Sequence, residues 1–209
     1  MSEIRAVLFD YGGVLAEEGF SNGLEALARE QDLAVKDMTA EGMQAVYDSG
    51  FVLGKGSEAG FWKLLRARTG LSGGDAALHD RMIEGFVIRP WMLALVERLK
   101  AKGTITGILS DQTDWLDSLD ARDDFYKYFD RIYNSFYMGK GKRDPSHYAD
   151  VAADLGLAPA AILFIDDNDA NVAMARRAGL QALQYTERDS FFKNIHELLK
   201  LNGIHAPDA

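Results

Sequence analysis

The 209-residue sequence has no cysteine, only four prolines, and no apolar run long enough to cross a membrane. Without cysteine the chain can form no disulfide, no thiol nucleophile and no cysteine-ligated zinc site. A transmembrane helix needs about 18 or more consecutive apolar residues. The apolar stretch near the N-terminus is too short for a signal peptide and leads straight into a carboxylate. We therefore expect a soluble, cytoplasmic protein with no membrane partner.

Positive charge is also scarce in this chain. Its 23 Lys and Arg residues face 32 Asp and Glu residues, which gives a net charge of -9. Proteins that bind nucleic acid cluster Lys and Arg against the phosphate backbone, so we expect no nucleic-acid partner. The remaining composition, 47% hydrophobic and 26% charged, is typical of a globular protein with a substantial buried core.

Apolar runs alternate with helical patterns along most of the chain. Strands are predicted at residues 4–9, 104–110, 131–135, 161–167 and, more weakly, 180–186. Helices are predicted at residues 89–102, 144–155 and 170–178. This alternation predicts the α/β class, with a Rossmann-like, doubly wound parallel sheet covered by helices on both faces.

The alternation fails between residues 16 and 88. This segment contains helical patterns such as "SNGLEALAREQ" and "SEAGFWKLLRARTG", with no convincing strand between them. A helical insertion after the first strand is the simplest interpretation, and it is large enough to be a small domain. The predicted core is then formed by residues 1–15 and 89–209.

Polar residues follow the predicted strands, and ligands bind outside the carboxyl ends of strands in an open parallel sheet. The residues at these ends are Asp10, Ser110, Asp111, Asp166 and Asp167, with Lys142 in the loop after the third strand. Taken singly, a carboxylate or hydroxyl there is often a helix or turn cap, as Asp111 could be, and Lys142 could be a solvated loop cation. Two adjacent carboxylates, however, repel each other unless a cation lies between them.

Together these groups would suit phosphoryl transfer. Mg²⁺ prefers hard oxygen ligands, which Asp10, Asp166 and Asp167 could supply. Lys142 and Ser110 would bind the remaining phosphate oxygens, and a carboxylate would attack phosphorus to form an aspartyl phosphate. The glycines in "VLFDYGGVL" would let phosphate approach the backbone closely.

Four stretches in order resemble the motifs of the haloacid dehalogenase-like (HAD) hydrolase superfamily. They are "VLFDYGGVL", "TGILSD", "SFYMGKGKRDPSHY" and "ILFIDDNDAN". The resemblance covers nearly the whole chain and implies that residues 16–88 are the family's cap domain. It implies hydrolysis of a small phosphorylated metabolite with Mg²⁺ as cofactor.

The resemblance also implies a role for each motif residue. The implied catalytic residues are Asp10, Ser110 and Lys142. The implied metal ligands are Asp10, the carbonyl of Gly12, Asp166 and Asp167. The implied substrate-binding residues are Gly13, Ser110, Asp111, Lys142 and Asn171.

The chain departs from the family pattern at Gly12, where most phosphatases of the family carry a second Asp that acts as general acid and base. Its loss typically costs about 10²- to 10⁴-fold in rate. A sugar 1-phosphate or an acyl phosphate would suffer less, because its leaving group needs little protonation. Two alternatives stay open: a 2-haloacid dehalogenase, whose halide leaves without a proton, and a catalytically weak binding or regulatory protein. The sequence names neither the substrate nor the oligomeric state.

Overall fold

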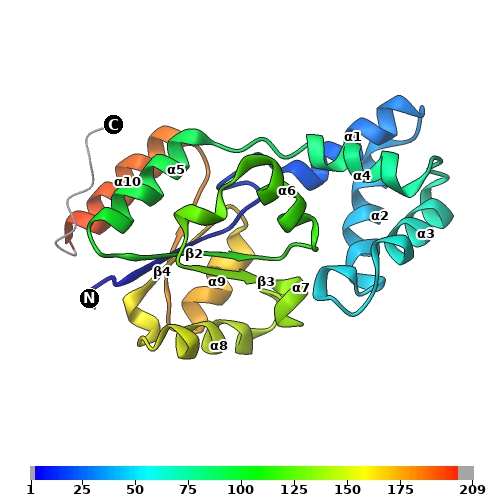
Figure 1. Cartoon of the computed structure of the whole chain (residues 1–209). Helices are drawn as coiled ribbons and strands as arrows, with labels where there is room; N and C mark the ends of the chain where they lie inside the picture. Colours follow the sequence, from blue (N-terminus) through cyan, green and yellow to red (C-terminus); the bar gives the residue numbers. More distant parts are fainter. Residues whose placement is uncertain (1–2, 202–209) are drawn as a thin grey trace.

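Five parallel strands form the centre of the protein, in the computed structural model that describes residues 3–201 (Figure 1). The strands are β1 (Ala6–Phe9), β2 (Ile105–Ser110), β3 (Arg131–Asn134), β4 (Ile162–Asp166) and β5 (Gln181–Gln184). Their order in the sheet is β3-β2-β1-β4-β5, and each neighbouring pair is parallel. The predicted α/β class and the doubly wound parallel sheet are therefore confirmed.

The strands agree with the predicted runs except at their ends. The third strand stops at Asn134, because the Asn134 side chain accepts a hydrogen bond from the Phe136 backbone N–H and starts a short helix there. The fifth strand is four residues long and only half-buried, as its place at the edge of the sheet allows. The central strand β1 is fully buried, so both of its faces must be covered by helices.

Helices cover the two faces of the sheet in separate layers. Val7 and Phe9 of β1 belong to a core cluster with residues of α5 (Pro90–Ala101), α6 (Trp115–Asp123) and α10 (Arg188–Leu201). On the opposite face, Ala6 and Leu8 belong to a cluster with α8 (Pro145–Leu155) and α9 (Asp169–Arg177). The shorter elements of the core are α7 (Ser135–Met138) and two 3-10 turns, η2 (Tyr126–Tyr128), which packs against the cluster of Val7 and Phe9, and η3 (Pro159–Ala161). Figure 1 shows the two layers above and below the sheet.

The segment after β1 is helical, as predicted, and forms a bundle beside the sheet (Figure 1). Its elements are α1 (Gly19–Glu30), α2 (Val35–Asp48), η1 (Phe51–Leu53), α3 (Glu58–Thr69) and α4 (Asp75–Glu84). The bundle has its own core around Phe61, Trp62 and Leu65, and Trp115 of α6 completes this core from the sheet side. The domain division at residues 16 and 88 stays a prediction, and residues 1–2 and 202–209 of the predicted core lie outside the described range.

The two segments that join the bundle to the core run side by side. The Arg89 backbone N–H donates to the carbonyl of Leu15 over 2.8 Å, and Ala16 and Ile88 form an antiparallel bridge. The bundle thus leaves and re-enters the core close to the end of β1. Among residues 3–201, no helix is both long and apolar enough to span a lipid bilayer.

Candidate active site

The carboxyl ends of β1 and β4 bring two buried carboxylates together. Asp10 follows β1, and Asp166 is the last residue of β4, the strand that pairs with β1. The chain runs from β1 to β2 on one side and places β4 on the other side, so these two strand ends flank the topological switch point of the sheet. Ligands of doubly wound sheets bind in the crevice at this point.

Lys142 joins these two carboxylates. Its Nζ lies 2.6 Å from Asp10 Oδ2 and 2.7 Å from Asp166 Oδ2, and the residue is only 2% exposed. Burial by itself lowers the pKa of Lys142, but the charges of Asp10 and Asp166 outweigh it and raise this pKa above its ordinary value. Lys142 is therefore a buried, permanently charged group at the centre of the site and not a solvated loop cation.

The second oxygen of Asp10 is held by two donors. Ser110 Oγ, at the end of β2, donates to Asp10 Oδ1 over 2.6 Å, and the Tyr11 backbone N–H donates to the same oxygen over 2.8 Å. Burial and the charge of Asp166 raise the pKa of Asp10, and Lys142 opposes this shift without cancelling it. The bonds to Ser110, Tyr11 and Lys142 fix the orientation of the Asp10 carboxylate.

The adjacent carboxylates Asp166 and Asp167 differ in burial and in their contacts. Asp166 is fully buried and accepts hydrogen bonds from the Asn168 backbone N–H at 2.8 Å and from Asn171 Nδ2 at 3.1 Å. Asp167 is half-buried and lines the cleft. Burial, and then the charge of Asp166, raise the pKa of Asp167. Asn171 therefore contacts Asp166, and its predicted role toward the substrate stays a prediction.

Three carboxylates lie close enough to share one cation. One oxygen from each of Asp10, Asp166 and Asp167 lies within 4.8 Å of the others. These are the three side chains that the sequence motifs nominated as metal ligands. Their hard oxygen atoms match the preference of Mg²⁺.

Gly13 makes room for Asp167. A Cβ atom at this glycine would lie 2.2 Å from Asp167 Oδ2, and its φ of +76° is one that other residues rarely adopt. The Gly13 carbonyl accepts a hydrogen bond of 2.6 Å from Arg89 Nη1. The sequence predicts that Gly13 lets phosphate approach the backbone. In the structure its missing side chain leaves room for the Asp167 carboxylate. Its contact with substrate stays a prediction, as does the metal contact of the Gly12 carbonyl.

Asp111 bridges the core and the helical bundle. Its Oδ1 accepts a hydrogen bond of 2.9 Å from the Lys142 backbone N–H, and its Oδ2 accepts one of 2.9 Å from the Tyr47 hydroxyl of α2. The interpretation of Asp111 as a helix cap is wrong, because Asp114 is the residue that precedes α6. The bond to Lys142 instead positions the loop that carries this lysine.

A cleft of about 510 Å³ opens above these residues, with walls from both the core and the bundle. Sequence reasoning missed several of the wall residues, which are Glu18, Tyr47, Gln112 and Arg143. Glu18, Tyr47 and Gln112 stand outside the four motifs, and Arg143 stands in the third motif beside Lys142 without an implied role of its own. Glu18 and Glu17 are adjacent identical residues, and nothing local indicates which one faces the cleft.

Glu18 brings a further carboxylate into the cleft. It precedes α1, where its side chain makes no capping hydrogen bond to the helix. Its Oε2 lies 3.2 Å from the place where a Cβ of Gly12 would be. Desolvation by the surrounding protein, and then the charge of Asp167, raise the pKa of Glu18, although the residue stays open to solvent.

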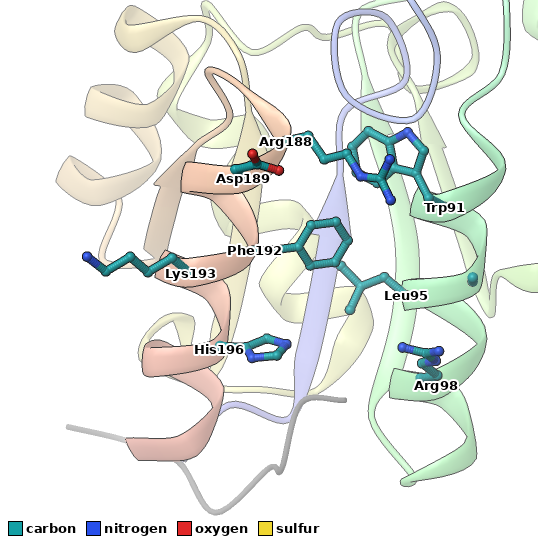
Figure 2. A pocket seen from close by; sticks show the side chains of 9 residues that line it. Trp91, Leu95, Arg98, Arg188, Asp189, Phe192, Lys193 and His196 are labelled. Carbon is teal, nitrogen blue, oxygen red and sulfur yellow. The ribbon is translucent and has the colours of Figure 1, made fainter. Parts of the chain in front are cut away.

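A second cavity, of about 550 Å³, lies between α5 and α10 and shares no lining residue with the cleft (Figure 2). Figure 2 shows Phe192 and Leu95 facing each other across it, and Arg188 lies 5.3 Å from the centroid of the Trp91 ring. Its one acidic lining residue is Asp189. A single carboxylate offers too few oxygen ligands to hold Mg²⁺ as the three carboxylates of the cleft could, so we assign the active site to the cleft.

Known proteins resemble this chain in sequence and in fold. Flavin mononucleotide hydrolase 1 of Arabidopsis thaliana is 27% identical over 121 residues, which are 58% of this chain and 49% of that protein. The chain spans about half or less of the length of the curated relatives it matches first.

Two solved structures share the fold at lower identity. A HAD family enzyme of Bacteroides thetaiotaomicron, in complex with magnesium and inorganic phosphate, has a TM-score of 0.71 and 22% identity over 90% of this chain and 98% of its own. L-2-haloacid dehalogenase of Xanthobacter autotrophicus has a TM-score of 0.67 and 19% identity over 99% of this chain and 90% of its own.

A family model places the chain more firmly than any single relative does. The model of haloacid dehalogenase-like hydrolases matches residues 4–179, which include all four motifs and the helical bundle. The chain therefore belongs to the haloacid dehalogenase-like hydrolases.

Proposed function

We propose that this hydrolase is a Mg²⁺-dependent phosphatase of a small phosphorylated metabolite and that Asp10 is transiently phosphorylated. The observation that carries the proposal is the arrangement of Asp10, Lys142 and Asp166. One buried carboxylate lines the cleft in a fixed orientation, a buried cation lies against it, and further carboxylates lie within 4.8 Å. This is the set of groups that phosphoryl transfer needs.

The residues present fit a magnesium ion. Asp10, Asp166 and Asp167 offer carboxylate oxygens, and the pKa of Asp167 is raised first by burial and then by the negative charge of Asp166. A divalent cation would relieve this repulsion. When bound, Mg²⁺ would neutralise charge on the phosphoryl group.

The side chains of the cleft have separate tasks in this reaction. An Asp10 oxygen attacks phosphorus, the bond from phosphorus to the leaving oxygen breaks, and water later cleaves the Asp10–phosphorus bond to release phosphate. Ser110 and the Tyr11 backbone N–H hold the carboxylate in the orientation for attack. The Lys142 ammonium and the Ser110 hydroxyl can donate to phosphoryl oxygens as their charge develops.

Gly12 offers no side chain to protonate the leaving oxygen. Substrates with good leaving groups, such as sugar 1-phosphates and acyl phosphates, therefore suit the site best by this criterion. Two similarities support a phosphate ester as substrate. One is the sequence similarity to flavin mononucleotide hydrolase 1, and the other is the shared fold with the enzyme that was solved with magnesium and inorganic phosphate.

A haloacid dehalogenase is the second candidate. Halide leaves carbon without a proton, so the lack of an acidic side chain at Gly12 would not slow that reaction. Against it stand Asp166, Asp167 and Glu18, since three further negative groups would repel an anionic haloacid in a metal-free site. A binding or regulatory role would also tolerate Gly12. A binding or regulatory role, however, does not require the buried ion pair between Asp10 and Lys142.

Phosphate release from a panel of metabolites tests the proposal. The panel contains sugar 1-phosphates, acyl phosphates and flavin mononucleotide, each with Mg²⁺ and with EDTA. We expect Mg²⁺-dependent turnover that is lost in Asp10→Asn and retained in Asp80→Asn, a control on the exposed face of α4. Halide release from 2-haloacids without metal would favour the dehalogenase instead. Turnover no higher than that of Asp10→Asn on every compound would favour the binding protein.

A further inference from the structure

An alcohol leaving group needs a proton, which a titratable group of the cleft would have to supply. Asp10 is the attacking group, and the Ser110 hydroxyl already donates to it. Asp166 is fully buried and is bonded by Lys142. The amide of Gln112 does not titrate. None of these groups is free to carry a proton to a leaving oxygen.

The other acidic side chains of the cleft differ in their hydrogen bonds and contacts. Asp111 is held by the Lys142 backbone and by the Tyr47 hydroxyl. Asp167 lies against Gly13 and within the group of three carboxylates. Two further acidic residues line the cleft, Glu18 and Asp169, and neither makes an ion pair within the described range 3–201. Of these two, Glu18 is the one whose carboxylate lies against the place that a side chain of Gly12 would occupy.

The position of Glu18 is specific. Gly12 lies two residues after Asp10, and a side chain there would point at the Glu18 carboxylate, which lies 3.2 Å from the built Cβ. The Glu18 carboxylate therefore reaches, from the start of α1, the space beside the nucleophile that Gly12 leaves empty. Gln112 Nε2 lies 3.8 Å from the same point.

We propose that Glu18 is the catalytic acid and base of this site, a role that rests on the proposed phosphatase function. The Glu18 carboxyl group gives its proton to the leaving oxygen as the phosphorus–oxygen bond breaks, which releases a neutral alcohol. The resulting carboxylate then takes a proton from water as the water oxygen attacks phosphorus and the bond to Asp10 breaks. The cycle ends with phosphate released and Glu18 protonated again.

This role changes the expected substrate class. Without an acid at Gly12 or elsewhere in the cleft, the site would be restricted to leaving groups that depart without a proton. With Glu18 as acid, ordinary alkyl phosphate monoesters become substrates as well.

The test compares Glu18→Gln on two substrates with different leaving groups, glycerol 1-phosphate and acetyl phosphate, both with Mg²⁺. We expect kcat/KM for glycerol 1-phosphate to fall by about 10²- to 10⁴-fold, the usual size of a general acid effect. For acetyl phosphate kcat/KM changes little, because acetate needs no proton to leave. The kcat for acetyl phosphate still falls and phosphorylated Asp10 accumulates, because water attack has lost its base.

Two further variants sharpen the result. Glu25→Gln on the exposed part of α1 is the matched control and should behave as the wild type. Gly12 has no positive φ and its nearest neighbours are the ends of flexible side chains, so Gly12→Asp can be accommodated. In the double variant Gly12→Asp/Glu18→Gln, a carboxylate returns beside Asp10, and we expect activity on glycerol 1-phosphate to recover at least tenfold.

Three results would overturn the inference. Glu18→Gln could match Glu25→Gln on both substrates, or it could lose kcat/KM equally on both, which would mark a structural role. A wild type that is active on acetyl phosphate but inert on glycerol 1-phosphate would also exclude an acid in the cleft. These results leave the phosphatase function intact, whereas a wild type that releases no phosphate from any compound would remove both proposals.

Discussion

The Asp167 side chain occupies the space that a side chain at Gly13 would need. The absent Cβ of Gly13 leaves room for Asp167 Oδ2, which lies 2.2 Å from the position that such an atom would take. The carboxylate cannot retreat without leaving the group of three that includes Asp10 and Asp166. At this position the choice of glycine therefore controls the placement of an acidic side chain 154 residues further along the chain.

Replacing Gly13 with alanine should affect both stability and activity. The left-handed backbone costs about 1–2 kcal/mol, and the overlap with Asp167 adds about 1–3 kcal/mol. Gly156→Ala is the matched control, because Gly156 also has a positive φ, at the end of α8, but has no neighbour within 4 Å. We expect urea unfolding to show the larger loss in Gly13→Ala, and phosphate release to fail only in that variant. Equal effects in the two variants would mean that the overlap with Asp167 is relieved at no cost.

At the scale of elements, the two connections between bundle and core are clamped by one side chain. Arg89, which precedes α5, donates to both carboxylate oxygens of Glu17 at 2.8–2.9 Å. Its Nη1 donates to the carbonyls of Gly13 and Val14 at 2.6 and 3.1 Å. The guanidinium thus ties the outgoing segment after β1 to the returning segment before α5.

Removing this clamp should loosen the loop that carries Gly13. For Arg89→Ala we expect a loss of about 2–4 kcal/mol in the free energy of unfolding, because hydrogen bonds from a charged donor are each worth about 1.5–3 kcal/mol. Arg29→Ala is the control, since its pair with Glu25 is exposed and worth about 0.5 kcal/mol or less. Phosphate release should fall in Arg89→Ala and not in Arg29→Ala. A similar unfolding midpoint for both variants would contradict the clamp.

At the scale of the whole molecule, the cleft lies where the bundle meets the carboxyl edge of the sheet. Tyr47 of α2 bonds Asp111, and Ser135 Oγ donates to the Val52 carbonyl over 2.7 Å. Five acidic side chains line this cleft and Asp166 lies buried beside it, against only two cationic lining residues, Lys142 and Arg143, on a chain with a net charge of -9. An anionic substrate would meet a negative site unless a cation were bound first.

Magnesium should therefore stabilise the folded protein. At a concentration 100 times its Kd, a ligand of the native state adds about 2.7 kcal/mol, which for a chain of this size raises Tm by about 5–10 °C. Thermal unfolding in MgCl₂ and in NaCl of equal ionic strength separates binding from screening. In Asp167→Asn the rise with MgCl₂ should shrink to a few degrees. An equal rise in NaCl, or an unchanged rise in the variant, would argue against a metal at this cluster.

Local patterns were sufficient for much of the fold. Buried strands such as β1 are short, uniformly apolar runs, and helices such as α5 begin at a proline and end near a glycine, so each can be recognised within a dozen residues. Asp10, Ser110 and Asp166 could be predicted for the same reason, because each directly follows or ends such a strand and all strand ends of a parallel sheet meet at one edge.

The contacts that refine the site could not be predicted in this way. Glu18, Arg89 and the bridging role of Asp111 depend on which segments far apart in the chain come to lie together. Tyr47 and Asp111 are 64 residues apart, and Glu17 and Arg89 are 72 residues apart. No local pattern distinguishes Glu18 from Glu17.

The sequence by itself determined the α/β class, the family and the motif carboxylates, because these depend on hydrophobic periodicity and on short-range spacing. Only the tertiary structure decided that Lys142 is buried between Asp10 and Asp166. It also decided that the Asp167 side chain fills the space beside Gly13 and that the Glu18 carboxylate lies beside Gly12. These are distances between separate elements, and packing of the bundle against the sheet sets them.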